Sequence, residues 1–221
     1  MTSSASTLLL LSVASTLSAA DDLAAMRAHN TFFPPFLSGT WFVGQGGDTP
    51  NVNDHMALPE QAFGVDLVLT VDRSLASGDG TKVSDFYSYG QVVVSPCDGT
   101  VIEVENARPD NQIGKTDEDH EFGNHVIIDA GKNEYVVLAH FKPGSLTVAV
   151  HDHLTPGKPI ALVGFSGNTT EPHLHMHIQD SPLLRHGHGL LFTFTGVTGT
   201  ISGTQLENHD VPLIRGEWLK R

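Results

Sequence analysis

Residues 172–178 read Pro-His-Leu-His-Met-His-Ile, so three histidines alternate with apolar residues. Alternate side chains of a β-strand point to the same face, and the pattern therefore predicts a strand with His173, His175 and His177 together on one face. The Gly- and Asn-containing turn at residues 164–168 indicates that this strand is entered from a loop. Imidazoles on one face can share a metal ion, although histidines on an exposed strand can also be solvated or hydrogen-bonded.

The rest of the chain extends this β pattern. From Trp41 onward, short runs rich in Val, Ile, Leu and Thr are separated by Gly, Pro, Asn and Asp, which is typical of all-β domains. Polar loops are expected at residues 74–80 and 108–121, because neither stretch has helical apolar spacing. The expected strands are residues 65–71, 90–94, 100–105, 125–130, 135–141, 145–150, 159–163 and 173–179.

The ends of the chain are interpreted from their local composition. Residues 21–30 could form a short helix, whereas the prolines within residues 32–36 exclude a regular one. The short apolar run at residues 190–194 is expected to add a strand or loop to the main domain. The expected organisation is a lead-in at residues 21–40, a main domain at 41–180 and a C-terminal extension of that domain at 181–221.

Composition limits the class of protein. The chain has 221 residues, of which 39% are hydrophobic and 17% are charged, and this balance predicts one compact globular domain. The net charge of −13 and the lack of basic runs argue against nucleic acid and anionic lipid as partners. The single cysteine, Cys97, excludes an intrachain disulfide and a Cys-rich zinc finger, and we interpret it as a structural thiol in a turn.

The first 20 residues carry no charged side chain and contain a short leucine-rich centre. They resemble a secretory signal, although a buried N-terminal helix is the alternative, because the segment has no Lys or Arg at its start. We therefore expect a secreted or cell-envelope protein, and a cytoplasmic one if residues 1–20 are not a signal. No segment approaches the run of about 20 apolar residues that a membrane span needs.

Further candidate residues lie at the ends of other expected strands. His140 stands near the end of the apolar run 135–141, and Asp66 stands at the start of the run 65–71. His55 lies upstream in a polar loop. Taken singly, each is more often structural than catalytic. Together with His175 they supply imidazoles and one carboxylate, which suit nitrogen and oxygen ligation of Zn²⁺ with a position left for water.

The order and spacing of these motifs resemble those of lysostaphin- and LytM-type zinc metallopeptidases across roughly residues 41–180. The family implies a mainly β fold of antiparallel sheets, the duplicated hybrid motif, with a substrate groove. It also implies one zinc ion per chain and cleavage of peptides in bacterial peptidoglycan. The stretches that carry the resemblance are Trp-Phe-Val-Gly-Gln-Gly-Gly-Asp at 41–48, Asn-Asp-His at 53–55, Gly-Val-Asp at 64–66, Val-Ser-Pro-Cys-Asp-Gly-Thr-Val at 94–101, Ala-His-Phe at 139–141 and Pro-His-Leu-His at 172–175.

The resemblance makes Asp66 and His175 zinc ligands and makes His140 and His173 catalytic histidines. The third ligand departs from the family pattern, because the usual histidine four residues before the aspartate is replaced by Ala62. The nearest upstream candidate is His55, which is expected to fold back toward the metal. If His55 cannot reach the metal, His177 is the first substitute to test.

Alternative functions follow from the same features. Loss of the usual ligand favours a zinc-free, catalytically inactive groove-binding module that regulates a cell-wall hydrolase. Phosphotransferase carriers share the hybrid fold and also have paired histidines. A phosphocarrier needs an imidazole that accepts phosphate, however, and has no use for a metal-binding carboxylate such as Asp66. The chain has no His-Glu-x-x-His helix, so a thermolysin-type mechanism is not supported. Glu171 could orient a neighbouring imidazole, although a solvated carboxylate is the simpler interpretation.

Overall fold

A computed structural model describes residues 26–206 and 213–221, and the expected signal at residues 1–20 lies outside this part of the chain. Within it, four short 3-10 helices are η1 (Asp54–Ala57), η2 (Pro59–Gln61), η3 (Val83–Asp85) and η4 (Glu118–His120). The strands are β1 (Thr40–Gln45), β2 (Val65–Thr70), β3 (Val92–Val94), β4 (Gly99–Glu105), β5 (Asn124–Asp129), β6 (Tyr135–Phe141), β7 (His153–Leu154), β8 (Pro159–Leu162), β9 (Leu174–Gln179), β10 (Thr198–Ile201), β11 (Thr204–Leu206) and β12 (Trp218–Lys220).

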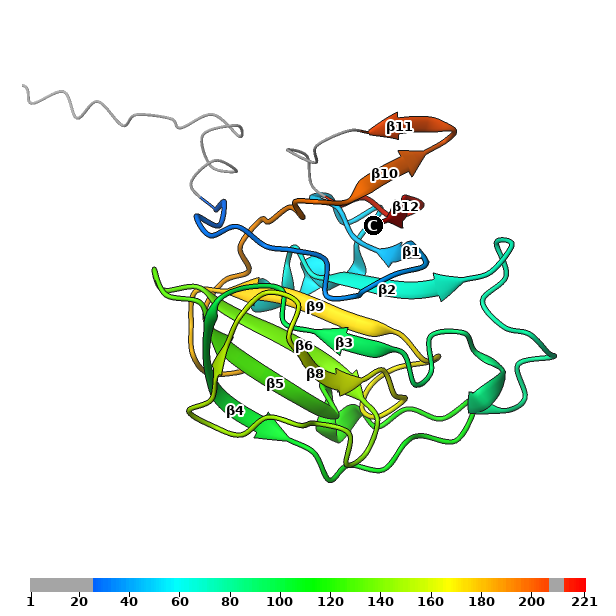
Figure 1. Cartoon of the computed structure of the whole chain (residues 1–221), viewed down its shortest axis with the longest axis horizontal. Helices are drawn as coiled ribbons and strands as arrows, with labels where there is room; N and C mark the ends of the chain where they lie inside the picture. The colour runs from blue at the N-terminus through cyan, green and yellow to red at the C-terminus, as the bar shows by residue number, and fades with distance from the viewer. Residues whose placement is uncertain (1–25, 207–212) are drawn as a thin grey trace, which may run out of the picture.

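One large sheet dominates the described part of the chain. Its strand order is β11-β10-β12-β1-β2-β9-β6-β5-β4-β7, and β3 and β8 form a second, two-stranded sheet. The strand pairs of both sheets are antiparallel. Figure 1 shows β9 between β2 and β6, with β3 and β8 lying across one face of the large sheet. The expected mainly β fold of antiparallel sheets is confirmed.

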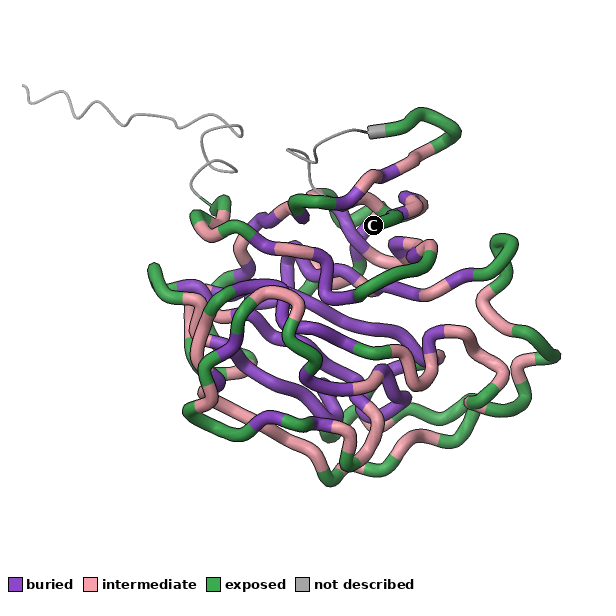
Figure 2. The backbone as a smooth tube through the Cα atoms, viewed as in Figure 1, coloured by how far each residue is buried: buried purple, intermediate pink, exposed green. Residues whose placement is uncertain are grey.

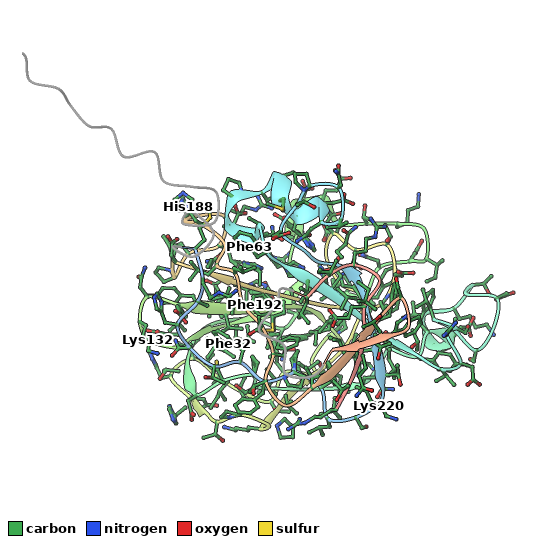
Figure 3. The ribbon with its side chains drawn as sticks, turned by 90° about the horizontal axis from the view of Figure 1, so that it is seen from above. Phe32, Phe63, Lys132, His188, Phe192 and Lys220 are labelled. Atoms are coloured by element: carbon green, nitrogen blue, oxygen red, sulfur yellow. The ribbon has the colours of Figure 1, made fainter. Side chains whose placement is uncertain are left out.

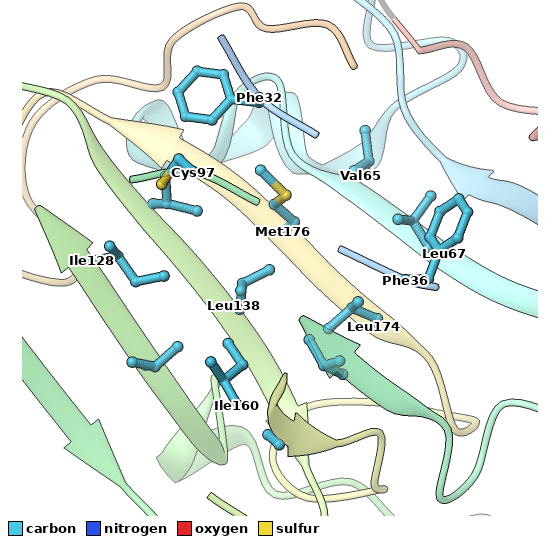
Figure 4. Packing of buried hydrophobic residues seen from close by; sticks show 14 of the residues in the cluster. Phe32, Phe36, Val65, Leu67, Cys97, Ile128, Leu138, Ile160, Leu174 and Met176 are labelled. Atoms are coloured by element: carbon cyan, nitrogen blue, oxygen red, sulfur yellow. The ribbon is translucent and has the colours of Figure 1, made fainter. Parts of the chain in front are cut away.

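The apolar positions of the histidine-rich strand point into the main core. Leu174 and Met176 of β9 are fully buried and pack with Leu138 of β6 and Ile160 of β8 (Figure 4). The turn residue Cys97 joins the same core, in agreement with a structural thiol. Because side chains alternate along a strand, the histidines of β9 lie on the opposite face of the sheet. Figure 2 shows the central strands buried along most of their length and the connecting turns exposed.

Segments from the two ends of the chain close the core. Phe32 of the lead-in packs edge-on against Phe192, with ring centroids 6.1 Å apart, and both lie in the interior in Figure 3. The buried carboxylate of Glu134, beside the turn between β5 and β6, accepts hydrogen bonds from the backbone N–H groups of His29 and Asn30. At the other end of the chain, β12 pairs with β1, so C-terminal residues extend the large sheet.

Some expected elements are wrong. Residues 145–150 contain the buried Leu146 and Val148 but form no strand, because their backbone N–H groups bond to scattered partners. Leu146 donates to the side chain of Asn106, and Ala149 donates to the side chain of Asp152. Residues 26–30 are not helical, and residues 21–25 of that expected helix lie outside the described part of the chain. The apolar run at residues 190–194 is a loop with isolated bridges, which is one of its two expected forms. The apolar pattern at residues 145–150 therefore predicted burial correctly. A strand would also need a neighbouring strand to pair with along its length, and these residues have none.

Candidate active site

Asp66 and His175 are direct partners on neighbouring strands. They are paired in the antiparallel register between β2 and β9. The two side chains point to the face opposite the main core, where the Oδ1 atom of Asp66 lies 2.9 Å from the Nδ1 atom of His175. Two of the residues predicted to bind metal are therefore brought together by the sheet itself.

His55 reaches this pair from the short helix η1, which Asn53 caps. The amide nitrogen of the fully buried Asn53 donates to the carbonyl oxygens of Gly47 and Gly64, so its amide oxygen must face His55. The His55 Nδ1–H group donates to that oxygen at 3.0 Å. The remaining ring nitrogen, Nε2, consequently directs its lone pair toward Asp66, whose Oδ1 atom is 3.5 Å away.

The three side chains could hold a metal ion. One ligand atom from each of His55, Asp66 and His175 can be chosen so that all three lie within 4.8 Å of one another. Ligands of a tetrahedral Zn²⁺ at about 2.0–2.1 Å from the ion lie about 3.3 Å apart. The contacts of 2.9 Å and 3.5 Å made by Asp66 bracket this spacing, and two imidazoles with one carboxylate are a donor set that zinc accepts.

Ala62, where the family pattern places a histidine, takes no part in this cluster. Its side chain packs in a separate apolar cluster with Phe63 and Leu191. The loop that contains η1 instead brings His55 to the aspartate. The predicted fold-back of His55 is thus present in the structure, whereas its role as a zinc ligand stays a prediction.

His140 lies at the end of β6 in a left-handed backbone conformation, with φ of 66°. Its Nδ1–H group donates to the carbonyl oxygen of Ser166 at 2.8 Å, and its Nε2 lone pair is thereby left free. The close approach of the Ser166 loop requires Gly123, since a Cβ atom there would come within 2.4 Å of the Ser166 backbone. Burial, together with the neighbouring His173 and His175, holds the pKa of His140 well below its usual value.

His173 lies beside His140, with ring centroids 4.7 Å apart. Its Nδ1–H group points to the carbonyl oxygen of Glu171 at 3.0 Å, and its Nε2 atom lies 3.3 Å from the Oδ1 atom of Asp66. Burial alone would lower the pKa of His173, but attraction to the Asp66 carboxylate outweighs it and raises the pKa. Glu171 therefore orients this imidazole through its backbone carbonyl group.

The Asp66 carboxylate is the electrostatic centre of the cluster. Burial would raise its pKa, but the neighbouring His173 and His55 outweigh burial and hold the pKa well below the usual value. The carboxylate is therefore charged at neutral pH. All five predicted site residues line one pocket of about 170 Å³, whose walls also include Phe122 and Glu121.

The remaining histidines are separate from this pocket. His177 is fully buried behind His175, with its Nδ1 atom 2.9 Å from the Nε2 atom of His175, so it does not complete the ligand set. Burial and the neighbouring His175 hold the pKa of His177 well below its usual value. His188 lies at the periphery of the molecule beside Asp180 (Figure 3).

Several residues that position the site carry only weak sequence signals. Asn53 stands beside His55 in the sequence, but its capping role depends on carbonyl groups up to 11 residues away. Thr169 contacts the Nδ1 atom of His173 through its hydroxyl group, and Ser166 binds His140 through its carbonyl oxygen. A backbone carbonyl group is present at every residue, so no residue type in the sequence marks that last contact.

The sequence matches the family model of Peptidase family M23 over residues 79–187. The match covers just under half of the chain and is consistent with a divergent member of this family. The matched residues include His140, His173 and His175, whereas His55 and Asp66 precede them. The matched family is one of peptidases, so the similarity supports a peptidase-type hydrolase.

Solved structures show similarity at low identity. A zinc-containing peptidase from Vibrio cholerae is 20% identical with a TM-score of 0.42, and the aligned region covers 67% of this chain and 36% of that chain. The catalytic domain of lysostaphin from Staphylococcus simulans is 17% identical with a TM-score of 0.41, covering 67% and 85%. A chain of the SpoIIQ–SpoIIIAH pore-forming complex is 14% identical with a TM-score of 0.47, covering 74% and 89%.

This chain thus spans about a third of the length of the Vibrio cholerae chain, 36%. No curated protein sequence matches it. Within residues 26–206 and 213–221, no helix is long and apolar enough to cross a membrane.

Proposed function

We propose that the chain is a zinc metalloendopeptidase that hydrolyses peptide bonds of bacterial cell-wall peptidoglycan with a metal-activated water. The observation that carries this proposal is the convergence of His55, Asp66 and His175. These residues offer two imidazole nitrogens and one carboxylate oxygen within 4.8 Å of one another, at the floor of a pocket. Three protein ligands leave a fourth zinc position for water.

Zinc held by His55, Asp66 and His175 would supply a Lewis acid, which would polarise the scissile carbonyl group and lower the pKa of bound water toward about 7. The two catalytic histidines are suited to different tasks, because their pKa values are displaced in opposite directions. His140 is neutral and has its Nε2 lone pair free, so it suits a general base. The Asp66 carboxylate raises the pKa of His173 and so favours a proton on Nε2, which suits His173 to be a hydrogen-bond donor.

Hydrolysis then follows from proton transfers by these two residues. His140 accepts a proton from the attacking water, whose oxygen bonds to the scissile carbonyl carbon. The His173 Nε2–H group donates a hydrogen bond to the oxyanion of the tetrahedral intermediate. His140 returns its proton to the leaving nitrogen as the C–N bond breaks, which restores the neutral imidazole.

We infer the substrate class and the cellular location from the similarity to the family. Short peptide bridges, with Gly-Gly bonds or bonds that involve D-amino acids, are the expected substrates. Cleavage of such bridges places the protein outside the cytoplasm, in agreement with a signal at residues 1–20, so we propose a secreted or cell-envelope location. The peptide would lie over the Phe122 wall of the pocket.

Metal analysis of the purified full chain tests the proposal. About one zinc per chain, together with release of new amino groups from purified peptidoglycan or a pentaglycine peptide, is the expected result. Chelation should abolish the release, and added zinc should restore it. Absence of zinc under metal-replete conditions would instead favour the inactive groove-binding module, against which stands the presence of His55 beside Asp66.

A further inference from the structure

A buried row of polar side chains continues from His175 along β9. The Nε2 atom of His175 lies 2.9 Å from the Nδ1 atom of His177, and the Nε2 atom of His177 lies 3.1 Å from the Oε1 atom of Gln179. All three residues are at most 2% exposed. They share one face because they are two residues apart on a strand.

We propose that His177 and Gln179 are positioning residues, which place the proton of His175 on Nε2 and so keep its Nδ1 lone pair available for the metal. This role rests on the proposed zinc site and deepens it. Neither residue touches the substrate or the reacting atoms.

The orientation of the Gln179 amide determines which atoms along the row donate hydrogen bonds and which accept them. Its amide nitrogen donates to two carbonyl oxygens, that of Ser181 at 2.7 Å and that of Leu183 at 2.9 Å. A flipped amide would place its oxygen against both carbonyl oxygens, and two acceptors cannot form a hydrogen bond. The amide oxygen must therefore face His177, which donates to it from Nε2.

The position of the proton on His175 follows from the position of the proton on His177. A neutral imidazole that carries its proton on Nε2 has only an acceptor at Nδ1. The buried surroundings of His177, which include the Phe122 ring with its centroid 5.7 Å away, oppose a second proton on the ring. The His177 Nδ1 atom therefore accepts a hydrogen bond from the Nε2–H group of His175.

The last link reaches the metal site. Because His175 uses its Nε2–H group toward His177, its Nδ1 atom is the nitrogen that faces the metal site, 2.9 Å from the Oδ1 atom of Asp66. Two acceptors at this distance require a proton or a cation between them. Asn53 holds His55 in the complementary way, with the proton on Nδ1 and the Nε2 lone pair directed at the same oxygen.

Matched substitutions at position 177 separate this role from simple packing. His177→Leu keeps bulk but removes the acceptor, whereas His177→Asn keeps a short side chain with an acceptor oxygen. Loss of such a partner behind a metal ligand weakens affinity by about 10–100-fold. Zinc dissociation constants from chelator competition should rise by this factor for His177→Leu, while His177→Asn retains most of the affinity.

Nitrogen-15 spectroscopy of the wild-type imidazoles tests the row without any substitution. The expected signature in the zinc-free and the zinc-loaded protein is a proton on Nε2 of both His175 and His177, with an unprotonated Nδ1 atom on His177. Gln179→Met should disturb this signature at His177 and weaken zinc binding, even if the variants at position 177 fail to fold. A proton on Nδ1 of His177 would overturn the proposal.

These experiments also distinguish failure of the positioning role of His177 and Gln179 from failure of the proposed zinc site. A wild-type protein that binds no zinc contradicts the proposed function, while the spectra of the zinc-free protein still decide the direction of the row. A wild-type protein that binds zinc, with His177→Leu and Gln179→Met binding it equally tightly, would overturn the positioning role alone. Thermal unfolding of the zinc-free variants checks that the measured affinities belong to folded protein.

Discussion

Asp66 and His175 are 109 residues apart in the chain, yet they face each other across the β2–β9 ladder with Oδ1 and Nδ1 2.9 Å apart. The antiparallel register fixes their alignment, so their proximity does not depend on a loop conformation. The third candidate ligand, His55, stands on a short 3-10 helix and depends on Asn53 for its orientation. The candidate site therefore combines a rigid pair from the sheet with one residue from a loop.

Replacement of either residue of the rigid pair should abolish both metal binding and activity. Asp66→Asn removes the only carboxylate of the ligand set, and His175→Ala removes one of its two nitrogens. We expect the zinc dissociation constant to rise by more than about 100-fold in each variant. Chelator competition measures this change, with His186→Ala in an exposed loop as the control.

His140→Ala should separate binding from turnover. His140 contacts Ser166 and His173 but is not part of the candidate ligand set, so zinc affinity should remain close to that of the wild type. Loss of a general base lowers turnover by about 10²–10⁴-fold. Metal content and peptide release, measured on the same preparation, check this result. Loss of zinc from this variant would instead place His140 among the ligands.

Gly64→Ala should disturb the site sterically. A Cβ atom at this position would lie 3.0 Å from the carbonyl oxygen of Gln61 and 3.2 Å from the Cε1 atom of His175, so the Gln61 turn and the His175 ring would have to shift. We expect zinc affinity to fall on the order of tenfold. Gly44→Ala is the matched control, because its Cβ atom would make only an ordinary 3.7 Å contact with the Asp66 carbonyl oxygen. Equal affinity in the two variants would contradict this steric account.

The zinc-free protein should lose stability in mildly acidic solution partly through His55. Burial is the largest cause that lowers the pKa of His55 from 6.5 to about 4. Between these values the unfolded chain binds a proton that the folded chain does not, so the stabilising contribution is present above pH 6.5 and is lost as pH falls. The loss from this residue is at most about 1.4 kcal/mol per pH unit.

Comparison with His55→Gln isolates this contribution. Urea unfolding from pH 7 to pH 5 should show wild-type stability falling more steeply than that of the variant. Parallel pH profiles would show that His55 is not held neutral by the fold.

The sequence predicted the central strands of the large sheet, which are β2, β4, β5, β6 and β9, because they are short runs rich in Val, Ile, Leu and Thr between turn residues. The alternation in β9 placed the three histidines on one face, as the structure shows. Residues 145–150 show the limit of this approach, since Leu146 and Val148 are buried without a partner strand. Whether a segment forms a strand depends on pairing with segments that are distant in the chain, and a local sequence pattern does not indicate which segments these are.

The residues of the candidate site were predicted from the sequence, but the groups that orient them were not. Asp66, His140, His173 and His175 follow from strand ends and family motifs, and His55 from the absence of a histidine at position 62. The orienting groups were not predicted, because carbonyl oxygens such as that of Ser166 have no residue-type signal. His177 was considered as a substitute ligand, whereas in the structure it lies behind His175.

Anomalous diffraction at the zinc edge from crystals of the zinc-loaded full chain tests the central claim most directly. We expect one peak, about 2.0–2.2 Å from the Nε2 atom of His55, the Nδ1 atom of His175 and a carboxylate oxygen of Asp66. A fourth position should be open toward His140 and His173. A peak without His55 among its ligands, or no peak at this site in zinc-replete crystals, would contradict the account.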